Sequence, residues 1–135
     1  TRQTPAQGCV NGVQDLSGHV TTFAPEYAGS LRLVYEQPIG DLFLTIEPNL
    51  FFTDGYAIIS DFNPRNTQDS FAKVNLRVAL APASDQWELA LVGRNLNDEL
   101  TTHFCQEVPA VQTPNTVACS ADPPATYAFQ ARYNF

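Results

Sequence analysis

Long segments in which apolar and polar side chains alternate with a period of two constrain this sequence most. Five of them, each about ten to twelve residues long, are Glu26–Gln37, Leu42–Thr53, Phe71–Ala81, Gln86–Leu96 and Thr126–Phe135. Such a period predicts β-strands, because successive side chains of a strand point to opposite faces. Strands of soluble proteins average roughly five to six residues, whereas tilted strands that cross a bilayer need about 9–11. The lengths favour an all-β fold with membrane-crossing strands.

Each predicted strand has an apolar face and a charged face. The second strand, for example, places six apolar residues on one side: Leu42, Leu44, Ile46, Pro48, Leu50 and Phe52. The charged residues of the strands fall on the opposite side: Arg32, Glu36, Glu47, Lys73, Arg77, Glu88, Arg94 and Arg132. Alternation alone does not decide which face meets water, because a soluble β-sandwich shows the same pattern with its apolar side inward.

The aromatic residues of the apolar face gather toward its two borders if successive strands run antiparallel. One border then holds Tyr35, Trp87, Tyr133 and Phe135, and the other holds Tyr27, Phe52 and Tyr127. Aliphatic side chains fill the band between them. Rings with a polar tip prefer the interface between membrane and water, so this sorting predicts the aromatic girdles of an antiparallel transmembrane β-barrel.

The connections between the predicted strands alternate between short and long. Pro38–Asp41 and Pro82–Asp85 are tight turns, whereas Asp54–Ser70 and Asn97–Ala125 are long and polar. Bacterial barrels have short periplasmic turns and long extracellular loops. With the last strand entering from a long loop, we expect the C-terminus on the periplasmic side.

Pro48 interrupts the pattern, because it has no N–H to donate to a neighbouring strand. We interpret it as a β-bulge, with a wrongly drawn strand as the alternative. In the second long loop, Cys105 and Cys119 flank 13 residues, and we expect a disulfide between them and hence an oxidising compartment. The alternative is three unpaired thiols, and the pairing of Cys9 stays open.

Composition and motifs exclude several functions. The 14 Asp and Glu against 7 Lys and Arg give a formal charge of −7, which argues against a nucleic-acid partner. We find no phosphate-binding loop, no metal-spaced Cys/His cluster and no nucleophile–base pair, so we expect neither an enzyme nor a cofactor or metal site. His103 and Asp122 are interpreted as plain loop residues. The start, Thr1-Arg2-Gln3, resembles no natural initiator, and we interpret it as a cut in a longer chain.

Short motifs, taken in order, resemble those of the TonB-dependent outer-membrane receptors. They are Ala24-Pro25-Glu26-Tyr27, Tyr35-Glu36-Gln37-Pro38, Asn75-Leu76-Arg77, Trp87-Glu88-Leu89-Ala90-Leu91, Gly93-Arg94-Asn95-Leu96-Asn97-Asp98-Glu99, and Pro124-Ala125-Thr126-Tyr127 leading to Arg132-Tyr133-Asn134-Phe135. Together they cover about residues 15 to 135. Ala125 and Ala128 depart from the Arg and Gly that are frequent in the family.

The resemblance implies that residues 1–135 are the C-terminal part of a β-barrel, about five strands of a probable total of 22, without the plug. It implies a cell outer membrane of a Gram-negative bacterium. The whole protein would import a scarce nutrient, most often a ferric siderophore, with energy from TonB. The implied partners are outer-membrane lipid, the missing N-terminal barrel and plug, TonB, the outer-membrane assembly machinery and the cargo.

Two sets of strand residues have implied roles in such a barrel. The terminal strand resembles the signal that the assembly machinery reads, carried by Tyr127, Phe129, Ala131, Tyr133 and Phe135. The charged face would line the lumen, where it pairs with carboxylates of neighbouring strands or of the plug, or guides an anionic chelate. Two rival functions remain: a secreted soluble β-sandwich that acts as a binding module, and a passive porin-like barrel.

Overall fold

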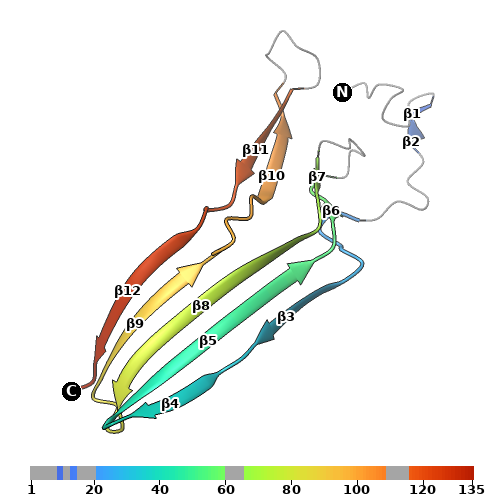
Figure 1. Ribbon diagram of the computed structural model, residues 1–135. Coiled ribbons are helices and arrows are strands. Elements are labelled where there is room, and N and C mark those ends of the chain that lie inside the picture. The colour runs from blue at the N-terminus through green and yellow to red at the C-terminus, as the bar shows by residue number, and fades with distance from the viewer. Residues whose placement is uncertain (1–8, 11–12, 15–20, 60–65, 109–115) are drawn as a thin grey trace. The chain divides into compact units, whose positions relative to one another are not determined.

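The computed structural model describes residues 9–10, 13–14, 21–59, 66–108 and 116–135, and in this part of the chain every regular element is a β-strand (Figure 1). All paired strands are antiparallel. The chain divides into two units: the sheet unit, residues 28–53, 71–100 and 123–135, and the loop unit, residues 1–27, 54–70 and 101–122. No helix capable of spanning a membrane occurs in the described ranges.

The sheet unit is one open antiparallel sheet. Its strands are β3 (Ala28–Arg32), β4 (Tyr35–Ile39), β5 (Leu42–Thr53), β8 (Phe71–Pro82), β9 (Trp87–Arg94) and β12 (Thr126–Tyr133). The order is β12-β9-β8-β5-β3, with β4 also paired to β5, so strands that follow one another in the sheet unit are neighbours. The predicted all-β, antiparallel fold is confirmed, whereas the sheet of this chain does not close into a barrel.

Among its described residues, the loop unit contains three small hairpins. They are β1 (Cys9–Val10) with β2 (Val13–Gln14), β6 (Tyr56–Ala57) with β7 (Thr67–Gln68), and β10 (Thr102–Glu107) with β11 (Val117–Ala121). The two long predicted loops therefore contain strands of their own. Sequence patterning did not reveal them, because the segments are short and polar.

The predicted bulge at Pro48 is wrong. β5 keeps one constant register with β8 over its whole length, and Pro48 lies opposite Leu76. The irregularity lies instead on the other side, where the first predicted strand separates into β3 and β4 without any change of register against β5. Leu33 N–H donates to the Pro48 carbonyl at 3.1 Å. The reciprocal bond needs the N–H that proline lacks, and this missing bond explains the gap.

Both short turns of the sheet contain a residue in the left-handed conformation. The two-residue turn between Ile39 and Leu42 has Gly40 at φ 61°, which suits a hairpin turn with positive φ at its first central position. In the turn between β8 and β9, Asp85 has φ 53° and its N–H donates to the Pro82 carbonyl at 3.0 Å. The short connections thus form tight hairpins at one end of the sheet.

A cluster of asparagines shapes the chain where β9 ends and β12 begins. Asn95 is buried and has φ 52°. Its side-chain oxygen accepts from the N–H of Glu99, and its Nδ2 donates to the carbonyls of Glu99 and Pro123. Asn97 continues the edge of β8, because its side chain accepts from the N–H of Val74 and donates to the Ala72 carbonyl. These bonds hold the start of β12 beside the end of β9.

Candidate functional site

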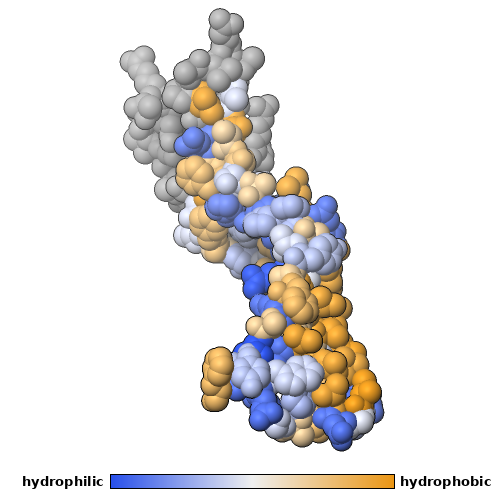
Figure 2. Space-filling model, turned by 90° about the vertical axis from the view of Figure 1, so that its left-hand side faces the viewer, coloured by the Kyte–Doolittle hydropathy of each residue, from blue (hydrophilic) through white to orange (hydrophobic). Residues whose placement is uncertain are grey.

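The apolar face of the sheet is exposed to its surroundings, and no second layer of the described residues covers it. Leu91 is 61% exposed, Phe129 66% and Leu33 58%. Ala79 and Ala90 are the buried apolar residues of the sheet unit within the described ranges, and both lie on the charged side. In Figure 2, apolar side chains gather along one side of the sheet. A large apolar surface of this kind marks contact with lipid or with another protein.

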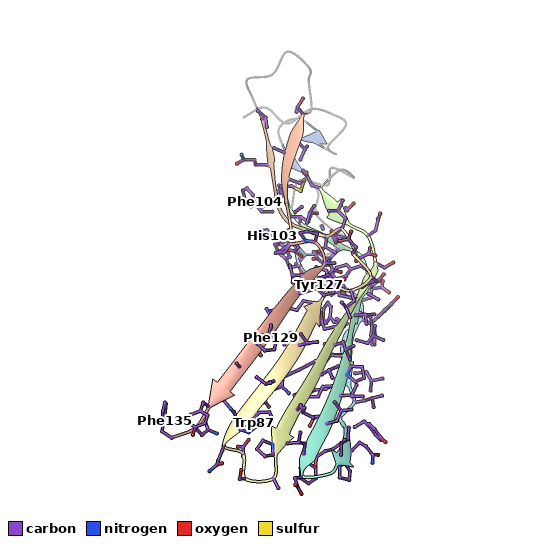
Figure 3. All side chains as sticks on the ribbon, turned by 60° about the vertical axis from the view of Figure 1, so that its left-hand side comes forward. Trp87, His103, Phe104, Tyr127, Phe129 and Phe135 are labelled. Atoms are coloured by element: carbon purple, nitrogen blue, oxygen red, sulfur yellow. A yellow bond between two sulfur atoms is a disulfide. The ribbon has the colours of Figure 1, made fainter. Side chains whose placement is uncertain are left out.

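Strand register sets the order of the aromatic residues on the apolar face. At the end with the short turns, Trp87 lies opposite Tyr133, whose ring centroid is 5.1 Å from that of Phe135. Near the other end, Phe52 lies opposite Gly29, and Tyr127 begins β12 at the end opposite to Phe135 (Figure 3).

Three aromatic residues depart from the predicted arrangement, in which the rings lie only at the two borders of the apolar face. Two of them, Tyr27 and Tyr35, were assigned to the girdles, and the third, Phe129, lies between the borders. Tyr27 falls in the loop unit, where its carbonyl accepts from the N–H of Asp54. Tyr35 pairs with Ile46, in the register row that leads to Phe129 in the middle of β12. Aliphatic side chains therefore do not fill the whole central band. Phe129 lies in that band because it pairs with Leu91 of β9, and it borders a hollow near Gly93.

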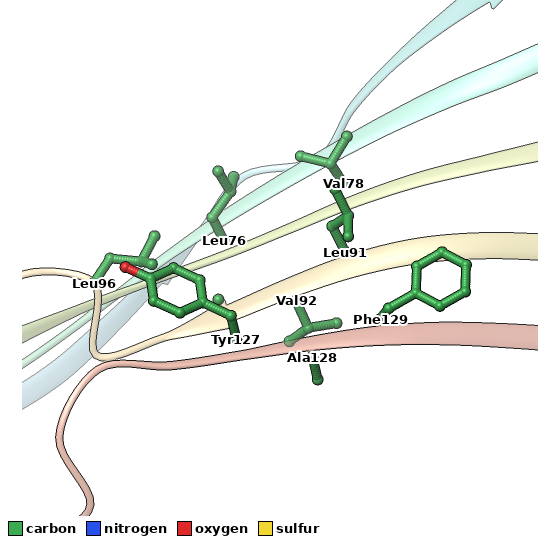
Figure 4. Close-up of a pocket in the computed structure, with 9 residues that line it drawn as sticks. Leu76, Val78, Leu91, Val92, Leu96, Tyr127, Ala128 and Phe129 are labelled. Carbon is green, nitrogen blue, oxygen red and sulfur yellow. The ribbon is translucent and has the colours of Figure 1, made fainter.

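That hollow has a volume of about 360 Å³ and opens on the apolar face (Figure 4). Leu76, Leu91, Leu96, Tyr127 and Phe129 are among the residues that line it. Gly93 lies opposite both Leu76 and Tyr127, and the side chain of Leu96 packs over its backbone. An acyl chain or an apolar side chain would fit such a lining.

The charged face contains a chain of ion pairs that crosses four strands. Glu47 on β5 contacts Arg32 on β3 and Arg77 on β8, and the second of these contacts measures 2.9 Å. Arg77 also contacts Glu88 on β9 at 2.6 Å. Glu47 lies directly opposite Arg77 in the register. Four of the eight predicted lumen charges are thus brought together.

The other four predicted lumen charges lie outside this chain of ion pairs. Arg132 instead contacts Asp85 in the turn before β9 at 3.1 Å. Lys73 lies 5.4 Å from the centroid of the Phe71 ring. Glu36 and Arg94 are exposed and have no ion pair among the residues that the structure describes.

Sequence analysis missed two features of the charged face. The first is a row of asparagines: Asn75 Nδ2 donates to Asn49 Oδ1 at 3.2 Å, and Asn75 Oδ1 accepts from the N–H of Asn95 at 2.9 Å. The second is a pair of rings, Phe51 and Phe71, with centroids 5.9 Å apart. The alternation puts both on the charged side, and this signal was available from the sequence.

The loop unit joins residues that are far apart in the sequence. Cys105 and Cys119 form a disulfide, and they lie directly opposite each other in the β10–β11 hairpin. Asp122 accepts from Thr101 Oγ1 at 2.5 Å and lies 2.9 Å from His103 Nδ1. Asp122 and His103, interpreted from the sequence as plain loop residues, thus contact each other at the base of this hairpin.

Further contacts connect the hairpins of the loop unit. Thr102 donates from both its N–H and its hydroxyl to Gln68 Oε1, and the N–H of Phe23 donates to the Ala57 carbonyl. Burial raises the pKa of Tyr56, and the negative charge of Asp122 raises it further. The described residues contain no group of three or more His, Cys, Asp or Glu that could hold a metal ion.

No protein-family model matches this chain, and no curated protein or solved structure shows significant similarity to it.

Proposed function

We propose that this chain forms part of the wall of an outer-membrane β-barrel that actively imports a scarce nutrient, with a ferric siderophore as the cargo that fits the family resemblance. The exposed apolar face supports the lipid contact, since Leu91 and Phe129 are more than half exposed in a sheet whose other face is charged. Residues 1–135 would be the C-terminal part of the barrel domain, and TonB and the plug would act through the missing N-terminal part.

Strand length is consistent with a bilayer. β5 and β8 each contain 12 residues. At about 3.3 Å per residue such a strand is about 36 Å long, and a tilt of about 45° gives a height of about 25 Å. This height equals the apolar band of outer-membrane barrels, which is about 25 Å tall. The two faces would then meet lipid and an enclosed lumen.

A secreted β-sandwich would need a second layer over the apolar face, and the described residues supply none. A passive barrel would share the geometry proposed above, so the two are separated by their energy requirement. The assembly machinery would recognise the apolar row of β12, whose outer edge is open for pairing with another strand.

Neighbouring residues of β12 allow a test of the lipid contact. Phe129 and Gln130 are both exposed and point to opposite faces. In the full-length protein refolded into lipid vesicles, we expect Phe129→Arg to lower the free energy of unfolding by about 2–4 kcal/mol. Gln130→Arg should change it by less than about 0.5 kcal/mol, because that side chain meets a polar lumen. Equal and small effects of both substitutions would refute lipid contact.

Transport is tested in cells. A strain that lacks the full-length gene should lose uptake of one iron chelate, and a strain that lacks TonB should lose it as well. If uptake persists without TonB, the protein is a passive pore. If the strain without the gene takes up every chelate normally, iron import is not its function, whatever the outcome of the lipid test.

A further inference from the structure

A second hollow, on the charged face, is lined by a row of polar residues from neighbouring strands. Arg32 on β3 lies opposite Asn49 on β5, which in turn lies opposite Asn75 on β8. Arg94 follows Gly93, the last residue of β9 in register with β8. With Glu47, Arg77 and the backbone near Gly93, these residues line an open hollow of about 240 Å³.

The hollow has an excess of positive charge. Three guanidinium groups line it, those of Arg32, Arg77 and Arg94, against one carboxylate, that of Glu47. Glu88 lies outside the lining and pairs with Arg77. Counting both carboxylates, one positive charge is left over, although the chain as a whole has a formal charge of −7. A local excess of positive charge in a chain with a net negative charge points to an anionic partner at the hollow.

In this hollow, Arg94 is the guanidinium that has no carboxylate partner among the described residues. Its side chain is exposed, and within the described ranges that side chain has neither an ion pair nor a hydrogen bond. Glu47 cannot neutralise it, because that carboxylate is held by both Arg32 and Arg77. The guanidinium of Arg32 is on a side chain that is 63% exposed, so it keeps donors for a further acceptor.

The amides between the two arginines are held in place. Asn75 has its oxygen engaged by the N–H of Asn95 and donates to Asn49, so Asn49 Oδ1 is already an acceptor. The Nδ2 of Asn49 therefore points away from Asn75, and its hydrogen bond to the Leu31 carbonyl is long, at 3.5 Å. One amide donor of Asn49 is thus available beside Arg32.

We propose that this hollow binds a small oxyanion, a carboxylate or a phosphate, between Arg94 and Arg32. Arginine recognises such groups by two parallel N–H···O bonds, and Asn49 would donate a third. The site lies on the face opposite to the proposed lipid contact. Its test therefore does not depend on the transport assay and can fail or succeed separately from the proposed function.

The test uses the full-length folded protein and inorganic phosphate as the probe. We expect saturable broadening of the phosphorus NMR signal on addition of the wild-type protein. Arg94→Gln should weaken binding about tenfold or more, because it removes a charge-assisted pair. Arg94→Lys should weaken it less, since it keeps the charge but loses the planar fork.

Arg132→Gln is the matched control, because it removes an equal charge from the same face at a residue that pairs with Asp85. It should leave phosphate binding unchanged. Equal losses in Arg94→Gln and Arg132→Gln would reduce the effect to net charge and overturn the site. Should Arg94→Gln fail to fold, Asn49→Ala takes its place and must also weaken binding.

If phosphate shows no saturable binding to the wild-type protein, the proposal is overturned. In that case a carboxylate from another part of the polypeptide can occupy the hollow, and it would be found as a protein group within hydrogen-bond distance of Arg94. Adding acetate separates the two kinds of oxyanion: a site for both should release phosphate as acetate is added.

Discussion

Two glycines of the apolar face lie beneath the side chains of other residues. A Cβ atom on Gly29 would be 2.7 Å from Cζ of Phe52, and one on Gly93 would be 2.5 Å from Cδ2 of Leu96. Phe52 is the cross-strand partner of Gly29, so the ring covers the backbone that glycine leaves bare. Leu96 does the same for Gly93 from the segment after β9. At both positions the residue needs to be small.

We therefore predict that Gly93→Ala destabilises the full-length protein by about 1–3 kcal/mol, because the added methyl group displaces Leu96. The free energy of unfolding in urea, measured in lipid or detergent, tests this. Leu96→Ala in the same chain should remove most of the added cost, since the clashing atoms are gone. Additive losses in the double variant would show that the clash is not the cause.

Tyr56 provides a prediction of pH dependence in the loop unit. Its pKa is raised above the ordinary value of 10.0, first by burial and then by the charge of Asp122. A folded-state pKa above that of the unfolded chain means that the contribution to stability is complete below about pH 10 and is lost as the pH rises further. Tyr56 should therefore ionise above the ordinary pKa of a tyrosine. The difference in tyrosinate absorbance between wild type and Tyr56→Phe measures this titration, and an ionisation at the ordinary pKa would contradict it.

At the scale of elements, two prolines of the same hairpin behave differently. The backbone nitrogen and carbonyl of Pro48 face β3 and β4, since the Pro48 carbonyl accepts from the N–H of Leu33. A residue other than proline would donate its own N–H on this side. In an antiparallel pair such bonded positions alternate with positions that point away. Pro38 lies at the other kind of position, opposite Phe43, so its missing N–H would have pointed to the open edge. One proline interrupts the edge strand and the other does not.

We predict that Pro48→Val stabilises the sheet by about 0.5–1.5 kcal/mol, since it restores one backbone hydrogen bond and keeps the apolar face apolar. The new N–H of position 48 should also be protected from hydrogen exchange. Pro38→Val is the control and should gain no protected N–H. An unprotected amide at position 48 would mean that proline is not the reason for the gap between β3 and β4.

Most of the sheet could be predicted from alternation, because one exposed apolar face imposes a period of two. β5 agrees with its predicted bounds, and β8 extends one residue further, to Pro82. The break between β3 and β4 could not be predicted from the sequence. It depends on which side of β5 the backbone nitrogen of Pro48 faces. The asparagine row was missed for a similar reason: uncharged polar residues give no pairing signal until the register is known.

The predicted charges show the same limit. Alternation placed all eight on one face, but pairing depends on side-chain reach across strands. Glu47 is opposite Arg77 and so could be paired from the register. Arg132 lies opposite Glu88 yet contacts Asp85, because the turn before β9 brings that carboxylate within reach. A turn residue in the left-handed conformation is not visible in a two-residue period.

For the whole molecule, the exposed face and the open edges predict poor solubility. Expressed alone, this chain should be insoluble without detergent or denaturant, because β12 and the strand pair β3 and β4 have unpaired outer edges. Sedimentation of the expressed chain in plain buffer, with and without detergent, measures this. A monodisperse monomer that unfolds cooperatively in buffer would favour the soluble sandwich.

The contacts within the loop unit also constrain how this protein can diversify. Thr102 depends on Gln68, and Phe23 depends on Ala57, so three segments that are distant in the sequence share one set of bonds. A substitution of Gln68 removes the acceptor of both Thr102 donors, whereas the bond between Phe23 and Ala57 joins backbone groups. Among relatives, exchanges at positions 68 and 102 should therefore occur together, and the segments should be inherited as one block when such proteins recombine.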